Sequence, residues 1–357
     1  MNKQITINGK ILSEADLVRA ADNPLLPDWE RQVYAFVINW FDHSEEIEQK
    51  TSGSTGSPKK IMLKKSMMVA SAHKTIRYFD FKSGQVAWLC LPVKYIAGKM
   101  MVVRAIEARL NLVLSEPLSS PVIPVSKVDF AALVPMQMHK MLSAGEDFSR
   151  ISKLIIGGAA VDFKLLKHIE KLSCEVYATY GMTETSSHIA LQRLNGSKPD
   201  AHFKLLDGFS VATDAHGCLQ IIAPDFFSGV MQTTDVVELI SPVAFRWLGR
   251  VDHVINSGGI KISPEPIEKE ISLLINSECV ITSLPDEVLG QKLVLIIEGS
   301  ADISPKKLLI DKIKQRFGKH LVPKLVYYLD VLPRSSNMKI DRAELVHIIK
   351  TINLING

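Results

Sequence analysis

The stretch TSGSTGSPKKI, Thr51–Ile61, brings together hydroxyl side chains, two glycines and two lysines. Pro58 forbids an ordinary helix through its middle, so we expect a loop. Backbone N–H groups made accessible by glycine, hydroxyl groups and cations are all suited to a polyphosphate. A solvated Gly/Ser surface turn has the same composition, and the spacing G-x-x-x-x-G-K-[ST] of a P-loop cannot be placed on the stretch. The loop is therefore compatible with a nucleotide site, but not with the usual NTPase.

Short apolar runs with helical patterns between them follow this loop. They are VAWLCLP from Val86, LNLVLSE from Leu110, FAALVP from Phe130 and KLIIGGAAV from Lys153. Their alternation with helical segments predicts α/β layers. From about Phe203 the pattern changes to strand-like pieces broken by turn residues, which predicts an antiparallel β portion.

The chain is long enough for two domains. It has 357 residues, of which 46% are hydrophobic and 22% charged, so it exceeds the usual size of one domain. After Arg250 come strand-like pieces, a lysine-rich helical stretch from Pro305 to Lys319, and a final strand and helix. This part reads as an α+β domain of about a hundred residues, a size that folds independently. We predict an N-terminal domain over residues 1–249 and a C-terminal domain over residues 250–357.

Composition argues against several classes of protein. The 42 basic and 38 acidic residues give a formal charge of +4, and they are scattered without the like-charge block of a nucleic-acid-binding tail. Cys90, Cys174, Cys218 and Cys279 lie too far apart for a zinc site and are too few for a disulfide scaffold. The N-terminus lacks a signal-peptide pattern, and no segment reaches the roughly 18 apolar residues that span a bilayer. We expect a soluble, cytoplasmic protein that binds no nucleic acid.

Five segments resemble, in the expected order, the motifs of the adenylate-forming superfamily, which comprises the acyl-CoA synthetases and related adenylation domains. They are TSGSTGSPKK from Thr51, IIGGAAV from Ile155, YGMTET from Tyr180, TTD from Thr233 with GRVDHVINSGGIKISPEPIE from Gly249, and PRSSNMKIDR from Pro333. Each segment alone is a weak signal, whereas five in order from Thr51 to Arg342 form a strong one. The resemblance implies a large α/β domain that binds ATP and an acid, and a small mobile α+β domain.

The resemblance implies an ATP site that includes the loop and two strand ends. Its phosphate- and nucleotide-binding residues are Thr51, Ser52, Gly53, Ser54, Thr55, Gly56, Lys59, Gly157 and Gly158. In YGMTET, Tyr180 stacks on adenine, Thr183 contacts the α-phosphate and Glu184 holds Mg²⁺. These roles suit the residues, because an aromatic face binds a flat base and a carboxylate oxygen is a hard ligand for Mg²⁺. Without its neighbours, the segment reads as a strand that ends in a glycine turn.

The later motifs supply residues for the ribose, the hinge and the thiol route. In the resemblance, Asp235 grips the ribose hydroxyls with help from Arg250, since an ionised acceptor can take two hydrogen bonds. Asp252 falls at the interdomain hinge, while Gly258 and Gly259 line the route of the CoA pantetheine. A surface salt bridge and a flexible loop are the alternatives that the residues themselves leave open.

Lys339 resembles the lysine that bridges the acyl carboxylate and the α-phosphate during adenylation. As an isolated residue it is an exposed lysine beside a helix start. Met338 and Thr234 stand where the family usually has glycine. The phosphate loop also begins only about fifty residues into the chain. We therefore expect either a shortened N-terminal portion or a homo-oligomer that covers the exposed sheet edge.

The segment LPVKYIAGKMMVVRAI, from Leu91, resembles the acid pocket of the o-succinylbenzoate–CoA ligases of menaquinone biosynthesis. In that family an arginine nine positions after a gate histidine binds the benzoate carboxylate; here Tyr95 stands at the gate and Arg104 follows nine positions later. A buried second carboxylate needs such a cationic partner. Arg104 equally fits a helix residue that extends its charge to solvent, and Ala97 replaces a serine of some relatives. The resemblance thus implies Tyr95, Arg104 and Gly181 at the acid site.

The implied reaction has two steps and uses ATP, Mg²⁺ and CoA. A small-molecule carboxylic acid attacks the α-phosphate of MgATP to give an acyl adenylate and pyrophosphate. The C-terminal domain then rotates, and the CoA thiol displaces AMP. Three alternatives stay open: another acyl- or aryl-CoA ligase, an adenylation domain that loads a separate carrier protein, and a non-catalytic adenylate-binding sensor.

Overall fold

The computed structural model describes residues 3–50, 60–224, 226–300, 306–334 and 340–356. The chain divides into two compact units. Unit 1 comprises residues 1–158, 168–210 and 222–230, and unit 2 comprises residues 159–167, 211–221 and 231–357. Unit 2 thus includes residues 231–249, which we assigned to the N-terminal domain, and the predicted boundary at 250 stays a prediction.

Unit 1 is built on a sheet whose central strands run parallel. The spatial order is β11-β10-β9-β8-β7-β5-β6-β1-β2. The pairs from β9 through β8, β7, β5 and β6 to β1 are parallel, whereas β10, β11 and β2 pair antiparallel with their neighbours. The strands are β1 (Ile5–Ile7), β2 (Lys10–Leu12), β5 (Val86–Leu89), β6 (Asn111–Leu114), β7 (Val128–Leu133), β8 (Ile151–Ile156), β9 (Glu175–Gly181), β10 (His188–Arg193) and β11 (Phe203–Leu205).

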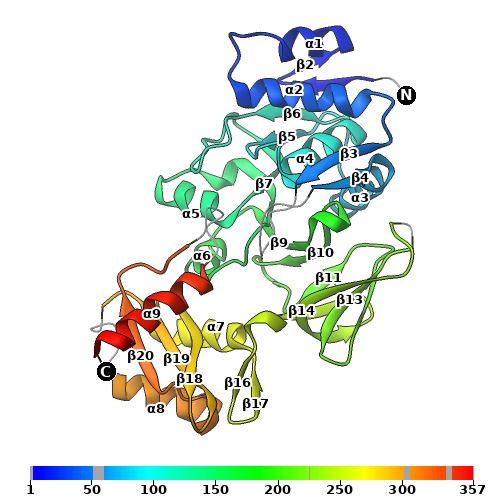
Figure 1. The fold of residues 1–357 in the computed structure, drawn as a ribbon. Helices are drawn as coiled ribbons and strands as arrows, with labels where there is room; N and C mark the ends of the chain where they lie inside the picture. Colours follow the sequence, from blue (N-terminus) through cyan, green and yellow to red (C-terminus); the bar gives the residue numbers. More distant parts are fainter. Residues whose placement is uncertain (1–2, 51–59, 225, 301–305, 335–339, 357) are drawn as a thin grey trace. The chain divides into compact units, whose positions relative to one another are not determined.

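Helices connect the parallel strands of unit 1, as the sequence pattern predicted (Figure 1). A parallel connection needs a crossover, and α4 and α5 supply crossovers between consecutive strands. A separate hairpin of β3 and β4 precedes α3 and pairs Lys50 with Lys60. The remaining elements are α1 (Glu14–Ala21), α2 (Asp28–Phe41), β3 (Glu46–Lys50), β4 (Lys60–Lys64), α3 (Lys65–Phe79), α4 (Ile96–Glu107), α5 (Pro135–Ser143) and the 3₁₀ turns η1 (Phe148–Arg150) and η2 (Thr183–Thr185).

The parallel strands are apolar because both faces of the sheet are buried. Trp88 in β5, Leu112 in β6 and Leu154 in β8 are all fully buried. Strands covered on both sides read as continuous apolar runs rather than as alternating patterns. The four apolar runs identified in the sequence are β5, β6, β7 and β8, so the predicted α/β fold class is confirmed.

The strand order of unit 1 changes direction at β5, and the loops at the carboxyl ends of the strands lie on either side of this point. Along the chain β6 follows β5, but in space β7 lies on the other side of β5. In open α/β sheets, ligands bind outside the carboxyl ends of the strands near such a reversal. The carboxyl ends of β5, β8 and β9 lead directly into the Tyr95, Gly157 and Gly181 segments.

Unit 2 contains the predicted antiparallel β portion and the predicted α+β part. In the first, β12 (Ser210–Thr213), β13 (Cys218–Ile222), β14 (Val230–Ser241) and β15 (Ala244–Arg250) are neighbours in that order. β14 and β15 pair antiparallel, with Asp235 opposite Arg250. The second part contains α6 (Phe163–Ile169), η3 (Val251–His253), β16 (Ile255–Ser257), β17 (Ile260–Ile262), α7 (Pro264–Ile275), β18 (Cys279–Asp286), β19 (Gly290–Glu298), α8 (Lys306–Phe317), η5 (Lys319–Leu321), β20 (Leu325–Leu329) and α9 (Arg342–Asn356).

A five-stranded sheet with helices on both faces forms the core of this α+β part. Its strand order is β17-β16-β19-β18, and β20 pairs parallel with β19. Cys279 and Ile281 pack with Ile271 of α7 and Leu309 of α8. The intervening Val280 belongs to the cluster of the opposite face, with residues of α9. Because successive strand residues point to opposite faces, one strand supplies both cores.

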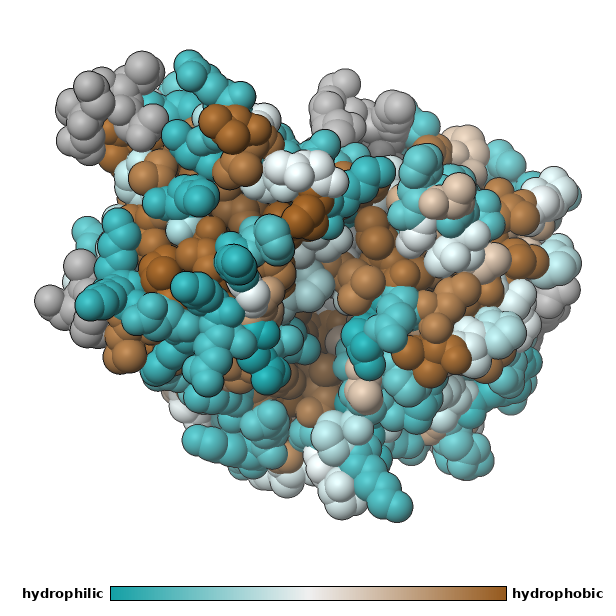
Figure 2. Space-filling view, turned by 90° about the horizontal axis from the view of Figure 1, so that it is seen from below, coloured by the Kyte–Doolittle hydropathy of each residue, from teal (hydrophilic) through white to brown (hydrophobic). Residues whose placement is uncertain are grey.

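Apolar side chains also reach the surface of the molecule. Figure 2 shows hydrophobic residues interspersed with hydrophilic ones on one face. Scattered exposed apolar residues are normal in folded proteins. Among the described residues, no helix is both long enough and apolar enough to cross a membrane.

Candidate active site

The YGMTET segment forms the end of β9 and the tight turn into β10. The Thr185 hydroxyl lies 2.9 Å from the Met182 carbonyl and 2.7 Å from the Ser187 carbonyl, and it accepts a hydrogen bond from the Met182 N–H. This buried side chain therefore ties both sides of the turn together. Glu184 is exposed and Thr183 half-buried, so the turn presents a carboxylate and a hydroxyl group at the carboxyl end of β9.

Gly181 is required by the close approach of β9 and β10. It lies opposite His188 in the strand register. A Cβ atom at Gly181 would lie 2.4 Å from the Ser187 carbonyl oxygen and 2.5 Å from the His188 Cα. Both neighbours are backbone atoms, so they cannot move aside as a side chain can. The motif glycine thus has a packing reason that does not depend on a ligand.

Gly157 and Gly158 follow β8 at the same edge of the sheet. A Cβ atom at Gly157 would meet the Thr179 hydroxyl at 2.4 Å, and Gly158 has a φ of +84°. Glycine adopts such a φ without strain. Tyr180, at the end of the neighbouring β9, is half-buried, and its ring centroid lies 5.9 Å from that of Phe203. The structure therefore brings the second and third motifs to adjacent strand ends within unit 1.

Arg104 lies in the middle of α4 and is only 2% exposed. Its Nη2 donates to the Ser187 Oγ at 2.6 Å, and its Nη1 contacts the Met101 sulfur at 3.8 Å. Its Nε has no hydrogen-bond partner among the described residues. Burial lowers the pKa of Arg104 to about 9, so the guanidinium stays charged at neutral pH. The alternative that Arg104 extends its charge to solvent is wrong, because Arg104 is buried together with its α4 neighbours from Met100 to Ala105.

A chain of hydrogen bonds extends from Arg104 to helix α3. The Ser187 Oγ lies 3.4 Å from the His188 Nδ1, and the His188 Nε2 lies 3.2 Å from the Thr75 Oγ1. The Thr75 hydroxyl in turn donates to the Ser71 carbonyl at 3.3 Å. Burial, and secondarily the charge of Arg104, lowers the pKa of His188 well below its usual value. The imidazole is therefore neutral at physiological pH.

Tyr95 occupies the N-terminal boundary of α4. Its side chain is 45% exposed, and the Lys94 ammonium lies 5.0 Å from its ring centroid. Tyr95 and Arg104 are thus on the same helix, but one is largely accessible whereas the other is buried. The structure shows where Tyr95 lies, and its role as a gate stays a prediction.

Asp235, Arg250 and Asp252 lie together within unit 2. The Arg250 Nη2 lies 2.8 Å from the Asp252 carboxylate, and its Nη1 lies 3.8 Å from the Asp235 Oδ1. The Trp247 indole N–H donates to the Asp235 Oδ1 at 3.2 Å. The arginine therefore bridges the predicted ribose carboxylate and the predicted hinge carboxylate.

Gly258 and Gly259 form the two-residue turn of the β16–β17 hairpin. Ser257 pairs with Ile260, and the two glycines have φ values of +59° and +82°. A two-residue hairpin with positive φ at both positions is the turn that best matches strand twist. These glycines have a local structural reason, and the CoA route stays a prediction.

Part of the predicted site lies outside the described residues. This holds for Thr51, Ser52, Gly53, Ser54, Thr55, Gly56, Lys59, Met338 and Lys339. The flanks of the last motif are described: Arg334 forms a bridge with Ile340, and the Asp341 N–H donates to the Pro333 carbonyl at 2.9 Å.

Sequence reasoning missed Thr75, Thr185, Ser187 and His188. One signal was present, because SSH directly continues YGMTET, and a histidine at the start of an apolar strand run is a candidate buried base. Thr75 gave no signal, since it lies 113 residues from its partner His188.

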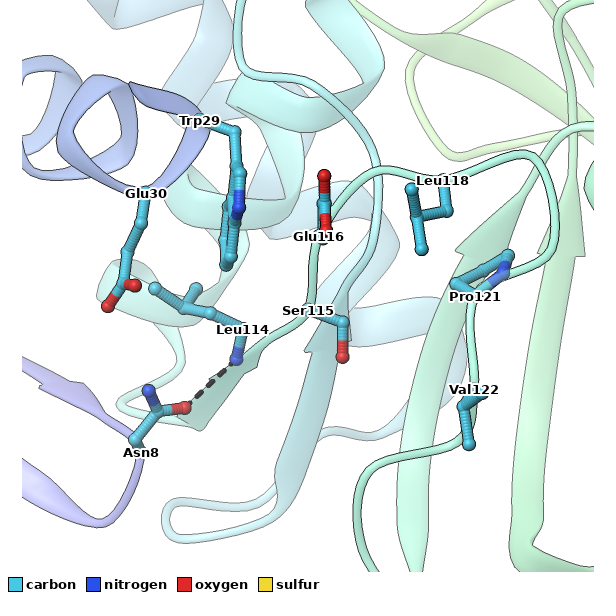
Figure 3. A pocket seen from close by; sticks show the side chains of 9 residues that line it. All are labelled: Asn8, Trp29, Glu30, Leu114, Ser115, Glu116, Leu118, Pro121 and Val122. Atoms are coloured by element: carbon cyan, nitrogen blue, oxygen red, sulfur yellow. Dashed lines mark hydrogen bonds between the residues drawn. The ribbon is translucent and has the colours of Figure 1, made fainter. Parts of the chain in front are cut away.

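A cavity of about 390 Å³ lies elsewhere in unit 1. Figure 3 shows Trp29 and Glu30 from α2 on one side of it, and residues at and after the end of β6 on the other. The Leu114 N–H donates to the Asn8 side chain at its edge, at 3.0 Å. None of the predicted site residues that the structure describes lines this cavity, so it is distinct from the site that those residues define.

Comparisons with known proteins agree with the fold and indicate the family. A family model for AMP-binding enzymes matches residues 49–209. An acyl-CoA synthetase (AMP-forming)/AMP-acid ligase II-like protein from Dyadobacter fermentans is 35% identical, with 94% of this chain and 98% of that chain covered and a TM-score of 0.63. A probable 2-succinylbenzoate–CoA ligase of Mycobacterium tuberculosis is 28% identical over 83% of this chain and 82% of its own length.

A third comparison concerns the fold alone. The o-succinylbenzoate–CoA synthetase of Bacillus subtilis, solved with its acyl-adenylate intermediate, is 21% identical and has a TM-score of 0.66 over 84% of this chain and 68% of its own. The chain therefore belongs to the AMP-binding, adenylate-forming enzymes, and within them to the AMP-forming acid–CoA ligases.

Proposed function

We propose that this ligase acts on o-succinylbenzoate and converts it, with ATP and CoA, to o-succinylbenzoyl-CoA, AMP and pyrophosphate. The observation that carries the proposal is the state of Arg104. This guanidinium is buried and charged at neutral pH, and its partners among the described residues are the neutral side chains of Ser187 and Met101, with no carboxylate in an ion pair. An arginine in that state has the charge and the free N–H donors to receive an anionic group from a substrate.

The energetic argument is that an isolated buried charge is costly. Taking an ion out of water costs several kcal/mol after relaxation, and a well-placed partner of opposite charge offsets this cost. The Nε without a partner and the remaining N–H groups of Arg104 are suited to a carboxylate, which accepts two parallel hydrogen bonds from a guanidinium. The second carboxylate of o-succinylbenzoate, remote from the reacting one, would supply this partner.

The nucleotide would bind at the carboxyl ends of β8 and β9. In this proposal Tyr180 packs on the adenine, Thr183 contacts the α-phosphate, and the loop from Thr51 to Lys59 holds the phosphates. Glu184 fits a magnesium ligand, because Mg²⁺ usually takes one or two protein carboxylates and completes its shell with phosphates and water. The ion would neutralise charge on the phosphate oxygens when bound.

Unit 2 would supply the remaining groups for two half-reactions. In the first, a substrate carboxylate oxygen attacks the α-phosphorus and pyrophosphate leaves, with Lys339 beside the developing charge. In the second, the CoA thiolate attacks the acyl carbonyl and the C–O bond to AMP breaks. Asp235 and Arg250 would hold the ribose, Gly258 and Gly259 would line the pantetheine route, and Asp252 would be the hinge.

The test is pyrophosphate release with two acids that differ only in the second charge. 3-Benzoylpropionate has the carbon skeleton of o-succinylbenzoate but lacks the ring carboxylate. We expect wild-type protein to prefer o-succinylbenzoate, and Arg104→Met to lower the ratio of the two kcat/KM values by 10²-fold or more, on the order of 3 kcal/mol for loss of one partner of a buried charge pair. Met is apolar and of similar length, so it limits any cavity.

The other outcomes separate the remaining candidates. If wild type prefers the monocarboxylate, or Arg104→Met lowers both kcat/KM values equally, the substrate assignment fails and a generic acyl-CoA ligase remains. Pyrophosphate release without formation of a thioester when CoA is added would favour transfer to a carrier protein. No release with any acid of a broad panel would favour an adenylate-binding sensor.

A further inference from the structure

In the part of the chain that the structure describes, Arg104 is held by neutral side chains. Its one strong hydrogen bond goes to Ser187, which contacts His188, which contacts Thr75. The participants come from α4, from the start of β10 and from α3, so tertiary packing alone brings them together. None of the proposed roles described above uses His188 or Thr75.

In the series of hydrogen bonds from Arg104 to the Ser71 carbonyl, the two end groups determine which atom donates in each bond. Arginine can only donate, so the Ser187 oxygen accepts from Arg104. A carbonyl can only accept, so the Thr75 hydroxyl donates to the Ser71 carbonyl at 3.3 Å, and its oxygen is left to accept from His188.

The Arg104 donor at one end and the Ser71 acceptor at the other together determine the protonation state and tautomer of the His188 imidazole. Nε2 of His188 carries the hydrogen and donates to Thr75, and Nδ1 accepts from the hydroxyl of Ser187. This is a neutral imidazole in one tautomer, with a donor and an acceptor both used.

This arrangement decides whether the positive charge of Arg104 is compensated inside the protein. A carboxylate at the position of His188 would lie within two hydrogen bonds of the guanidinium and would compensate its charge. A protonated imidazole would lose the acceptor for Ser187 and would add a second cation. Only a neutral acceptor both orients Ser187 and leaves the charge of Arg104 for an external anion.

We infer that His188 is a positioning residue for substrate specificity, which acts through Ser187 to orient Arg104 while leaving its positive charge uncompensated. The inference rests on the proposed function in that Arg104 receives the second anionic group of the substrate. The inference goes beyond the proposed function because it makes His188, which would contact neither the acid nor ATP, a determinant of the preference for a dianionic acid. Ser187 is the link, and Thr75 fixes the tautomer.

The test compares two substitutions that match in size and differ in charge, His188→Asn and His188→Asp. The Asn side-chain oxygen replaces Nδ1 as a neutral acceptor, whereas Asp places a carboxylate there. We expect His188→Asn to keep the ratio of kcat/KM for o-succinylbenzoate over 3-benzoylpropionate within about threefold of wild type. We expect His188→Asp to lower the same ratio by tenfold or more, mainly through KM for the dicarboxylate.

Other measurements keep the result interpretable. Ser187→Ala removes the link but leaves His188 in place, and it should lower the ratio as His188→Asp does. Because the ratio compares two acids on one protein, a loss of folded protein depresses both values and cancels. Equal ratios for His188→Asn and His188→Asp would overturn the inference while leaving the assignment of Arg104 intact. If Arg104→Met does not change the ratio of kcat/KM for the two acids, the proposed function is overturned instead.

Discussion

At the scale of single residues, the most informative side chains are polar groups inside an apolar unit. Arg104 and His188 are both buried, and the structure gives each of them neutral partners. A buried polar group costs free energy unless it is hydrogen-bonded, and a buried charge costs more unless it is paired. Both ring nitrogens of His188 have hydrogen-bond partners inside the protein, which offset the free energy of its burial. The partners of Arg104 offset the free energy of its burial only in part.

The burial of His188 predicts that acid destabilises the protein. Its pKa is lowered in the folded state, whereas an unfolded histidine has a pKa of about 6.5. Below that pH the unfolded chain binds a proton that the folded chain does not, so the free energy of unfolding falls as pH falls, by up to about 1.4 kcal/mol per pH unit from this group. Urea unfolding of wild type and His188→Asn at pH 7 and pH 5 measures this change in the free energy of unfolding.

We expect the stability lost between these two pH values to be smaller in His188→Asn than in wild type. His43→Asn is the control for the substitution itself, because His43 is an exposed histidine of the same unit. An identical loss in wild type and His188→Asn would contradict the account of a neutral buried imidazole.

At the scale of elements, helix α4 and the β9–β10 connection place the site residues. Six consecutive residues of α4, from Met100 to Ala105, are buried. The run MMVVRAI from Met100 is apolar except for Arg104, and apolar helix residues pack against a core. The connection after β9 is locked by Thr185, which leaves Thr183 and Glu184 directed away from the core.

The close approach of β9 and β10 predicts that Gly181→Ala is damaging. Its methyl group would lie within 2.5 Å of two backbone atoms of β10 and the residue before it. Overpacking of this kind typically costs about 1–3 kcal/mol. It would also move Ser187 and so weaken the hydrogen bond to Arg104. We expect a lower urea midpoint together with a lower ratio of dicarboxylate to monocarboxylate kcat/KM.

Gly84→Asn is the matched control for this substitution. No heavy atom lies within 4 Å of a Cβ added at Gly84, where φ is +83°, and asparagine tolerates positive φ. A urea midpoint for Gly181→Ala equal to that of the control would show that the two strands separate at little cost, and would remove the packing account of the motif glycine.

At the scale of the whole molecule, the proposed reaction needs groups from both units in two successive steps. We predict that Lys339→Ala and Asp252→Pro have opposite effects on these steps. Lys339→Ala should slow adenylation by on the order of 10²–10³, the usual loss for one electrostatic contact in a transition state, while sparing thioester formation from a pre-made acyl adenylate. Asp252→Pro should permit adenylation and slow thioester formation, because proline fixes φ at the proposed hinge.

Separate assays of pyrophosphate release and of thioester formation from synthetic adenylate check this pair. Asp252→Ala is the control for the hinge, since it removes the ion pair with Arg250 without fixing the backbone, and it should slow thioester formation much less. Equal losses in both steps for Lys339→Ala, or an unchanged overall rate for Asp252→Pro, would contradict the respective assignment.

The sequence determined the elements, the order of the motifs and the family. Apolar runs bounded by turn residues located β5 to β8, because strands covered on both faces leave a continuous apolar signal. Two adjacent glycines between strand-like segments mark the turn at Gly258 and Gly259, because positive φ is a local property of the backbone. Such features depend on a few neighbouring residues and can be inferred from them.

Only the tertiary structure decided which distant side chains meet. Ser187 lies 83 residues from Arg104, and His188 lies 113 residues from Thr75. No local pattern specifies these pairs, because they form only when α3 and α4 pack beside the start of β10. The same packing decided whether Arg104 is directed to solvent or buried. The residue spacing set the position of Arg104 on α4, but the elements that enclose it are distant in the sequence.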